Sequence, residues 1–210
     1  MAIQKIFTSR SVANGSDFVG EENRLWFNEQ TKTLHYSDGI TAGGRLISGG
    51  ATSSNGSGWA LYRDTANTSA TPFTLIAQQP TYIPNNAGVV FNTQLPSGVT
   101  AFYDVSTQKI TPARQNDYYI ITARFKAIAT INGSFLDLGL DTQGPLGYIF
   151  RETLPFTKGA GVEQAYSYRC PGFVSANFLN NGGRIVATAN NGDIDMYDIE
   201  YQIARVHTPL

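Results

Sequence analysis

Strict alternation of apolar and polar side chains in DYYIITARFKAIA constrains the fold of this chain more than any other feature of its sequence. In an extended strand, successive side chains point to opposite faces. Every second residue from Tyr119 to Ala127 is apolar, whereas the opposite face begins with the aromatic Tyr118 and ends with the charged Lys126. The stretch therefore predicts a long strand with one face in the core of a β-sandwich.

A second long strand is predicted near the end of the chain, in DIDMYDIEYQIARV. Its inward-facing residues would be Tyr197, Ile199, Tyr201 and Ile203, and its outward-facing residues Asp198, Glu200 and Gln202. The preceding segment, GRIVATANNGD, supplies a further strand and an Asn-Gly turn of the kind that closes hairpins. No helical period occurs, and about eight closely spaced strands are expected from Trp59 onward. Residues 59–210 are thus predicted to form an all-β jelly-roll sandwich.

Residues 1–47 are predicted to form a separate and smaller module. Its strands are expected at Ile3–Phe7, Arg24–Asn28 and Leu34–Tyr36. The module contains only about ten large apolar side chains, which are too few to offset the entropy cost of ordering its backbone. We therefore expect it to fold against a partner surface.

A linker is predicted between the two modules. Residues 48–58, SGGATSSNGSG, contain only Gly, Ser, Thr, Ala and Asn. This composition is typical of a flexible connection, so the domain boundary is placed there.

The charge and composition of the chain exclude several classes of partner. With 15 Lys and Arg against 16 Asp and Glu, the net charge is −1 and no run of like charge occurs, so nucleic acid is not an expected partner. No window approaches the roughly 18 apolar residues of a membrane span, and the N-terminus lacks the apolar run of a signal peptide. We expect synthesis in the host cytoplasm and no membrane insertion.

Catalytic chemistry is not predicted. The two histidines, His35 and His207, fall in the smaller module and near the C-terminus, and neither is expected to serve as a catalytic base. Cys170 is the single cysteine, which excludes an internal disulfide, and we interpret it as a buried apolar filler rather than a reactive thiol. No cofactor is expected.

Two groups of carboxylates are candidates for chemical sites. Asp137 and Asp141 lie on one face of a predicted strand, about 13 Å apart by the rise per residue, which is too far for a glycosidase pair. Asp193 and Asp195 lie near two asparagines and offer oxygen ligands, but their spacing fits no established calcium loop. A solvated hairpin turn is the better interpretation, and calcium binding there stays open.

A resemblance to a known family covers residues 90–127. The matching elements are Phe91-Asn92, Tyr103-Asp104, Thr107, Lys109, Thr111-Pro112 and the paired Tyr118-Tyr119 that opens the long strand. This pattern resembles the globular head shared by the complement subcomponent and tumour necrosis factor families. The resemblance implies a trimeric jelly roll. Because the outward face of the long strand has an aromatic start, Tyr118 and Ile120 are expected at the interface between heads. The segment before the tyrosine pair departs from the family, so its ligand sites are not transferred.

The stretch GEENRLWFNEQTKTLHYSDGITAGGRLI resembles a second family. Its Arg-Leu-Trp-Phe, Ser-Asp-Gly and Thr-Ala-Gly-Gly elements are similar to modules at the start of tailed-phage fibre and tropism-determinant proteins. The resemblance implies that three chains intertwine into a β-prism. The side chains expected to pack between chains are those of Leu25, Trp26, Phe27, Leu34 and Tyr36.

Together these features predict a non-enzymatic virion protein, a homotrimer anchored to the particle by residues 1–47. The first prediction is a short tail fibre that binds a glycan or protein of the host surface, and the alternative is a capsid decoration or head-fibre protein. The lack of long shaft repeats favours decoration or a short tip fibre, whereas the resemblance of the N-terminal module favours the tail. Aromatic and polar residues interleave in residues 144–169, which could form either a binding loop or an irregular cover over the sandwich end. The expected ligand contacts are Tyr148, Phe150, Arg151, Tyr166 and Tyr168.

Overall fold

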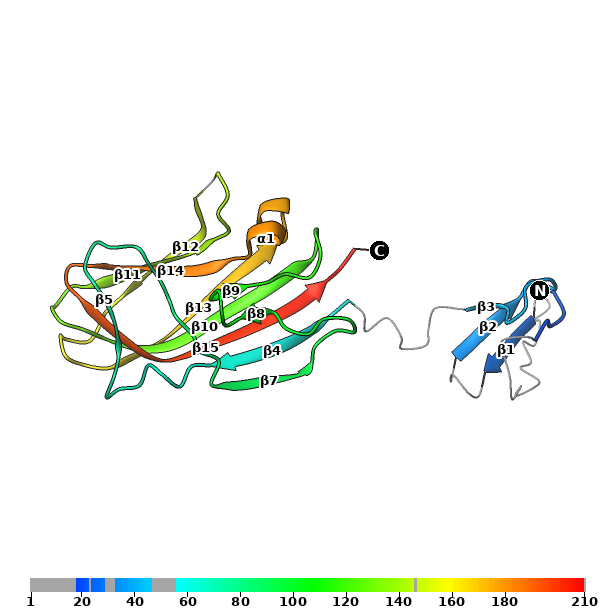
Figure 1. The fold of residues 1–210 in the computed structure, drawn as a ribbon, viewed down its shortest axis with the longest axis horizontal. Coiled ribbons are helices and arrows are strands. Elements are labelled where there is room, and N and C mark those ends of the chain that lie inside the picture. The colour runs from blue at the N-terminus through cyan, green and yellow to red at the C-terminus, as the bar shows by residue number, and fades with distance from the viewer. Residues whose placement is uncertain (1–17, 23, 29–32, 47–55, 146, 210) are drawn as a thin grey trace, which may run out of the picture. The chain divides into compact units, whose positions relative to one another are not determined.

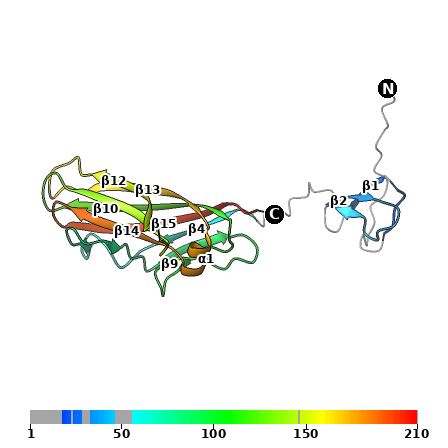
Figure 2. The same cartoon turned by 90° about the horizontal axis from the view of Figure 1, so that it is seen from above.

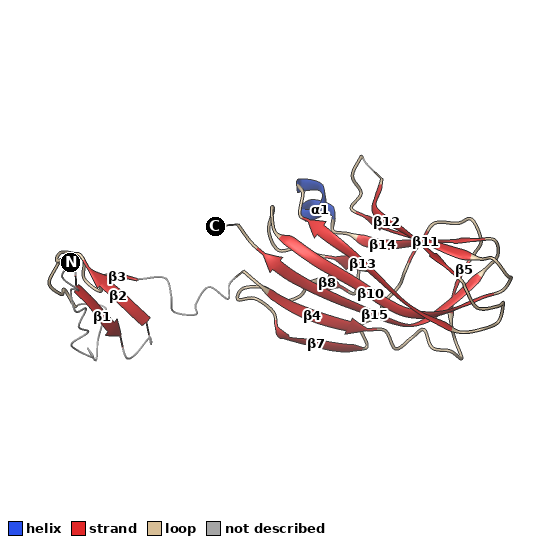
Figure 3. Cartoon of the chain, turned by 180° about the vertical axis from the view of Figure 1, so that it is seen from behind, coloured by secondary structure: helices blue, strands red, loops and turns tan. Residues whose placement is uncertain are grey.

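The structure is a computed structural model. It describes residues 18–22, 24–28, 33–46, 56–145 and 147–209. The chain divides into two compact units, Met1–Ser53 and Ser54–Leu210. Figure 3 shows that nearly all regular structure is β-strand, which confirms the predicted all-β class. The predicted strand Ile3–Phe7 lies outside the described residues, and within them no helix is long and apolar enough to cross a membrane.

The first unit contains a small antiparallel sheet. Its strands are β1 (Arg24–Asn28), β2 (Thr33–Ser37) and β3 (Arg45–Leu46), in the order β1-β2-β3. Leu25 pairs with Tyr36 and Trp26 with His35, so the two pairs point to opposite faces. The first two strands were predicted, but β3, with two residues, is too short to show alternation.

The Ser-Asp-Gly and Thr-Ala-Gly-Gly elements of the sequence form the turn between β2 and β3. The Asp38 carboxylate accepts hydrogen bonds from the backbone N–H of Thr41 (2.8 Å) and of Ile40 (3.1 Å), and from the Arg45 side chain (3.1 Å). These hydrogen bonds, chiefly those from Thr41, hold the pKa of Asp38 well below its ordinary value. Gly44 has φ +60°, and a Cβ there would lie 2.8 Å from the Tyr36 carbonyl oxygen, so the turn requires glycine at this position.

The second unit is a sandwich of two antiparallel sheets, seen in Figure 1. The large sheet has the order β13-β10-β15-β4-β7, formed by β13 (Gln164–Phe173), β10 (Tyr118–Ala129), β15 (Ile194–His207), β4 (Gly58–Arg63) and β7 (Val89–Gln94); β5 (Phe73–Leu75) also pairs with β15. The small sheet has the order β12-β11-β14-β6, formed by β12 (Tyr148–Pro155), β11 (Phe135–Asp141), β14 (Arg184–Asn190) and β6 (Thr81–Tyr82). A separate ribbon pairs β8 (Tyr103–Asp104) with β9 (Lys109–Ile110). A six-stranded sheet packed on a four-stranded sheet gives a sandwich of the jelly-roll kind.

The core between the two sheets confirms the predicted inward face of β10. Tyr119, Ile121 and Ala123 are fully buried, and Leu136 and Leu138 meet them from the small sheet. The buried tyrosine hydroxyls have hydrogen-bond partners, as expected because burying an unpaired polar group in a core costs free energy. The Tyr201 hydroxyl, for example, donates to the backbone carbonyl of Ile83 at 2.7 Å.

The prediction that Tyr197 points inward from β15 was wrong, because the strand contains a bulge. Arg124 pairs with Glu200 and Lys126 pairs with Tyr197, so β15 has one more residue than β10 in this interval. Asp198 absorbs the extra length with φ +52°. Tyr197 therefore shares the outer face with Lys126, where its hydroxyl donates to Glu163, while Ile199, Tyr201 and Ile203 point into the core as predicted.

We expect Asp198→Val to lower the free energy of unfolding by about 1–2 kcal/mol, because a β-branched residue resists the left-handed conformation of the bulge. Asp198→Gly should be close to neutral, since glycine accepts this conformation and the exposed ion pair with Lys126 contributes little. Urea denaturation of both variants measures the difference. Equal stability of the valine and glycine variants would show that the bulge imposes no such requirement.

The expectation of no helix was wrong at one place. Helix α1 (Ala176–Asn181) packs the fully buried Phe178 into the core, and Figure 1 and Figure 2 show it toward the end of the head where β15 finishes. The Ser175 hydroxyl accepts from the Phe178 N–H (3.3 Å), and Gly182, at φ +71°, donates its N–H to the Phe178 carbonyl (2.9 Å). Six residues are too few to produce a helical period in the sequence.

The end of the glycine-rich segment 48–58 belongs to the head rather than to the linker. Strand β4 begins at Gly58, and a Cβ at this position would overlap the carbonyl oxygen of Gln94 on β7. Glycine is therefore required there by close strand packing, although its neighbours in the sequence are typical of a linker. The neighbouring Gly56 carbonyl accepts a hydrogen bond from Arg205 at 2.7 Å.

Candidate interaction surface of the head

The outer face of the large sheet is divided into an apolar half and a charged half. The apolar half lies at the end of the head where β4 begins and β15 finishes, as Figure 1 shows for these strands. Its main side chains are Trp59, Phe91, Tyr118, Ile120 and Phe173. Phe173 is 55 % exposed and Phe91 54 %. Large apolar side chains left in contact with water on adjacent strands are typical of an interaction surface.

Strand register explains why these residues meet. Tyr118 lies opposite Phe173 in the β10–β13 pair, and Ile120 lies opposite Ala204, which in turn lies opposite Trp59. Directly opposed residues share a face, so side chains distant in the sequence form one continuous patch.

The charged half lies farther along the same strands and is internally paired. Glu200 accepts from Arg63 (3.0 Å) and from Arg124 (2.9 Å). Lys126 contacts Asp198 at 3.2 Å and Glu163 at 3.6 Å. The hydrogen bond to Asp198, with Glu163 nearby, raises the pKa of Lys126 above its ordinary value.

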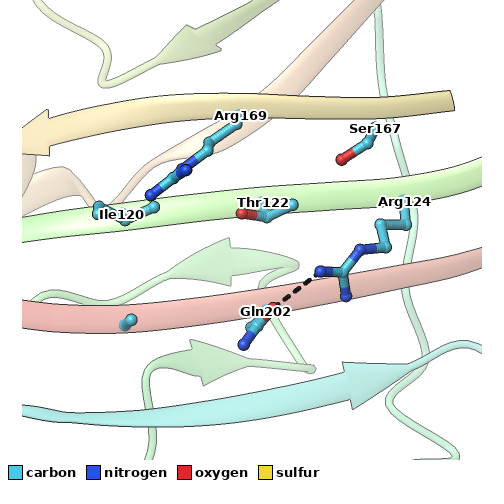
Figure 4. Close-up of a pocket in the computed structure, with 7 residues that line it drawn as sticks. Ile120, Thr122, Arg124, Ser167, Arg169 and Gln202 are labelled. Carbon is cyan, nitrogen blue, oxygen red and sulfur yellow. Dashed lines mark hydrogen bonds between the residues drawn. The ribbon is translucent and has the colours of Figure 1, made fainter.

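A hollow of about 400 Å³ separates the two halves. It is lined by Ile120, Thr122, Arg124, Ser167, Arg169, Gln202 and Ala204. Figure 4 shows that these residues come from β10, β13 and β15, and that Arg124 donates to Gln202 (3.1 Å) across the floor. A second hollow lies beside the first, between the start of β4 and the end of β7. Trp59 and Val206 are among its lining residues.

The two residues predicted for the head interface lie on this surface. Tyr118 is 37 % exposed and Ile120 is half-buried, and both point away from the core. Their position agrees with the alternation on which they were chosen, and their burial between chains stays a prediction.

The five predicted ligand contacts do not form one surface. Residues 144–169 are mostly the two strands β12 and β13 rather than a long loop, and these strands belong to different sheets. Tyr148, Phe150 and Arg151 are exposed on β12, and Tyr166 is half-buried. The prediction that Tyr168 contacts a ligand was wrong. Its side chain is fully buried, and its hydroxyl donates to the Phe150 carbonyl at 2.7 Å.

The residues predicted to pack between N-terminal modules differ in exposure. Trp26 is 3 % exposed within its own chain, with Phe18 against its edge at 5.0 Å and His35 stacked on it at 4.5 Å. Its own unit therefore already covers Trp26, and its packing against other chains stays a prediction. Leu25 and Tyr36, on the opposite face, are half-exposed. The side chains of Phe27 and Leu34 lie outside the described residues.

The histidines and carboxylates that are candidates for chemistry each have their own surroundings. His35 stacks on Trp26 in the first unit, and His207 is exposed at the end of β15. Asp137 accepts from Asn190 (3.0 Å), whereas Asp141 accepts from Tyr82 (2.9 Å). No described group of three or more His, Cys, Asp or Glu side chains could hold a metal ion.

The two carboxylates of the candidate calcium loop accept hydrogen bonds from different partners. Asp193 accepts from the Ala77 backbone N–H at 2.8 Å, and Asp195 accepts from the Thr74 hydroxyl at 2.6 Å. Asn191 and Gly192, both with positive φ, form the predicted hairpin turn between β14 and β15. The hairpin interpretation accounts for these side chains without an ion.

Cys170 is buried in the core, and burial raises the pKa of its thiol to about 12. Because the thiolate is the reactive species, the native protein at pH 8 should react with a disulfide reagent such as Ellman's reagent at least about a hundredfold more slowly than the unfolded chain. Absorbance during labelling, with and without urea, measures this. Prompt labelling of the native protein would contradict the burial.

Comparisons with known proteins give only distant structural neighbours. No family model and no curated protein sequence matches the chain. Among solved structures, it is similar to the Eiger TNF of S. frugiperda, with 10 % identity, 73 % of this chain and 95 % of that chain covered, and a TM-score of 0.42. It is similar to the PRD1 vertex protein P5 (13 % identity, 72 % and 73 % covered, TM-score 0.40) and to the globular domain of zebrafish complement 1qA protein (10 %, 73 % and 98 %, 0.39).

Proposed function

We propose that this protein is a non-enzymatic structural component of a phage virion, a homotrimer that displays its jelly-roll head. The observation that carries the proposal is the apolar half of the outer sheet face, which a single chain leaves exposed. Trp59 is 39 % exposed and Tyr118 37 %, and the more exposed Phe91 and Phe173 extend the patch to both sides. Apolar surface of this kind is stabilised when other copies of the chain cover it.

The first unit supports the same assembly. Its sheet has three short strands, and it leaves Leu25 and Tyr36 half-exposed on one face. A sheet this small is marginal alone and gains stability when matching faces of other copies meet. The resemblance of residues 20–47 to tailed-phage fibre modules supports the proposal that this unit attaches the protein to the particle.

The head would then present the small sheet outward. Tyr148, Phe150 and Arg151 on β12 belong to that sheet and stay exposed when the large sheet is covered. Aromatic and arginine side chains are favoured in recognition surfaces. Three copies would give avidity to weak contacts with a host-surface glycan or protein. A short tail fibre for host attachment is therefore our first assignment.

The mass of the full chain in solution tests the assembly. Multi-angle light scattering at micromolar concentration should give three times the 22.8 kDa of a single chain. A single-chain mass at this concentration would contradict the trimer and with it the role proposed for the apolar half.

The location on the particle tests the role. An antibody against the head, imaged on intact virions, should label the tail end if the protein binds the host. Label across the shell would instead assign it to capsid decoration or a head fibre, and absence of label from the particle would overturn the virion assignment.

A further inference from the structure

Among the described residues, no carboxylate pairs with the cation Arg169, unlike the other cations of the same sheet face. Arg63, Arg124 and Lys126 each contact a carboxylate in the charged half. Arg169 is exposed on β13, and within the described part of the chain it forms no ion pair. Its charge is therefore compensated only by water in a single chain.

Polar donors surround the Arg169 side chain in the hollow. Thr122 lies opposite Arg169 in the β10–β13 register, and Ser167 lies two residues away on the same face of β13. Figure 4 shows Arg169 extending toward Ile120, with the Thr122 hydroxyl between Arg169 and Arg124. Neither the Thr122 nor the Ser167 hydroxyl has a hydrogen-bond partner among the described residues. The hollow thus combines a guanidinium, two available hydroxyls and an apolar wall.

We propose that this hollow is a binding site for an oxyanion, the carboxylate or phosphate type of group, held by Arg169, Thr122 and Ser167. The planar guanidinium matches two oxygens of such a group, and hydroxyls supply further donors. Arg124, although paired with Glu200, adds positive potential at the same hollow.

The inference rests on the proposed trimer, because the hollow borders Ile120 in the face that other copies would cover. An uncompensated guanidinium removed from water is strongly unfavourable. Covering this face therefore requires a negative group beside Arg169. The group is either a free inorganic oxyanion or a carboxylate of a neighbouring copy, and the two sources share the same chemistry.

The test measures the trimer dissociation constant of the full chain by sedimentation, in sodium phosphate and in sodium chloride of equal ionic strength. With a free oxyanion, phosphate should lower the dissociation constant by at least about tenfold, since a ligand that binds only the assembled state stabilises it. Arg169→Gln should lose this response. Arg63→Gln, which removes a cation of the same face outside the hollow, should keep it.

The remaining outcomes separate the sources and the proposals. If phosphate has no effect on the wild type but the Arg169→Gln substitution raises the dissociation constant in both salts, the occupant is a carboxylate of a neighbouring copy. If Arg169→Gln behaves as wild type in both salts, the site is overturned while the trimer stands. If the wild type is a monomer, the proposed assembly fails, and calorimetric titration with inorganic phosphate decides the site: binding lost in Arg169→Gln supports it, and no binding overturns it.

Discussion

Tyr118→Asp is expected to convert the proposed trimer into single chains. Tyr118 lies opposite Phe173 in the apolar half, so assembly of the variant would bury a carboxylate in each of the three copies. Burying an uncompensated charge costs several kcal/mol per ion even after relaxation, about as much as a typical interface residue can contribute. Light scattering should give a mass near 22.8 kDa at the concentration where the wild type is trimeric.

Folding of each head should survive this change, because the Tyr118 side chain points away from the core. The matched control is Ile131→Asp, which places the same charge on a 48 % exposed isoleucine in the turn after β10. We expect the control to keep the wild-type mass, and circular dichroism should be unchanged in both variants. A trimeric Tyr118→Asp variant would show that the chains meet through another face.

Arg205→Met is expected to lower the free energy of unfolding of the head by about 3–5 kcal/mol, the usual cost of removing one partner of a buried ion pair. Arg205 is 5 % exposed and its guanidinium lies 3.3 Å from the Asp117 carboxylate, which is completely buried. The substitution leaves the Asp117 charge uncompensated in the interior. It also removes the hydrogen bond to the Gly56 carbonyl. Urea denaturation followed by fluorescence measures the loss.

Arg63→Met is the matched control for this prediction. Its ion pair with Glu200 is similar in length, but the Arg63 side chain is 54 % exposed, so we expect a loss of no more than about 1 kcal/mol. The double variant Asp117→Leu with Arg205→Met should recover part of the loss, because no unpaired charge remains buried. If Arg205→Met costs no more than Arg63→Met, the buried pair does not stabilise the head.

The long strands of the head could be predicted from the sequence because their alternation is uninterrupted. The core face of β10 follows from every second residue between Tyr119 and Ala127. The bulge at Asp198 could not be predicted, since the extra residue only becomes visible against the partner strand. Strands of two or three residues, such as β6 and β8, contain no period and depend on tertiary pairing.

The candidate site was predictable only in part. The outward direction of Tyr118 and Ile120 follows from local alternation, but the hollow depends on the register of three strands. Tyr168 was chosen for its chemistry, although its alternation with Arg169 and Cys170 already indicated the core. The same alternation assigns Arg169 to the outer face, so local sequence contained that signal. The lack of an acidic neighbour could be recognised only in three dimensions.

The entry of the chain into the head has a mechanical consequence. β4 begins at Gly58, directly opposite Arg205, and is hydrogen-bonded to β15 on one side and β7 on the other. A pull that reaches the head through Gly56 runs along β4 and loads its hydrogen bonds in shear, so they must break together rather than one by one. The Arg205 contact with the Gly56 carbonyl takes the first part of that load. If the head is bound to a partner and force is applied through Gly56, the head should therefore resist unfolding from the end at which β4 begins.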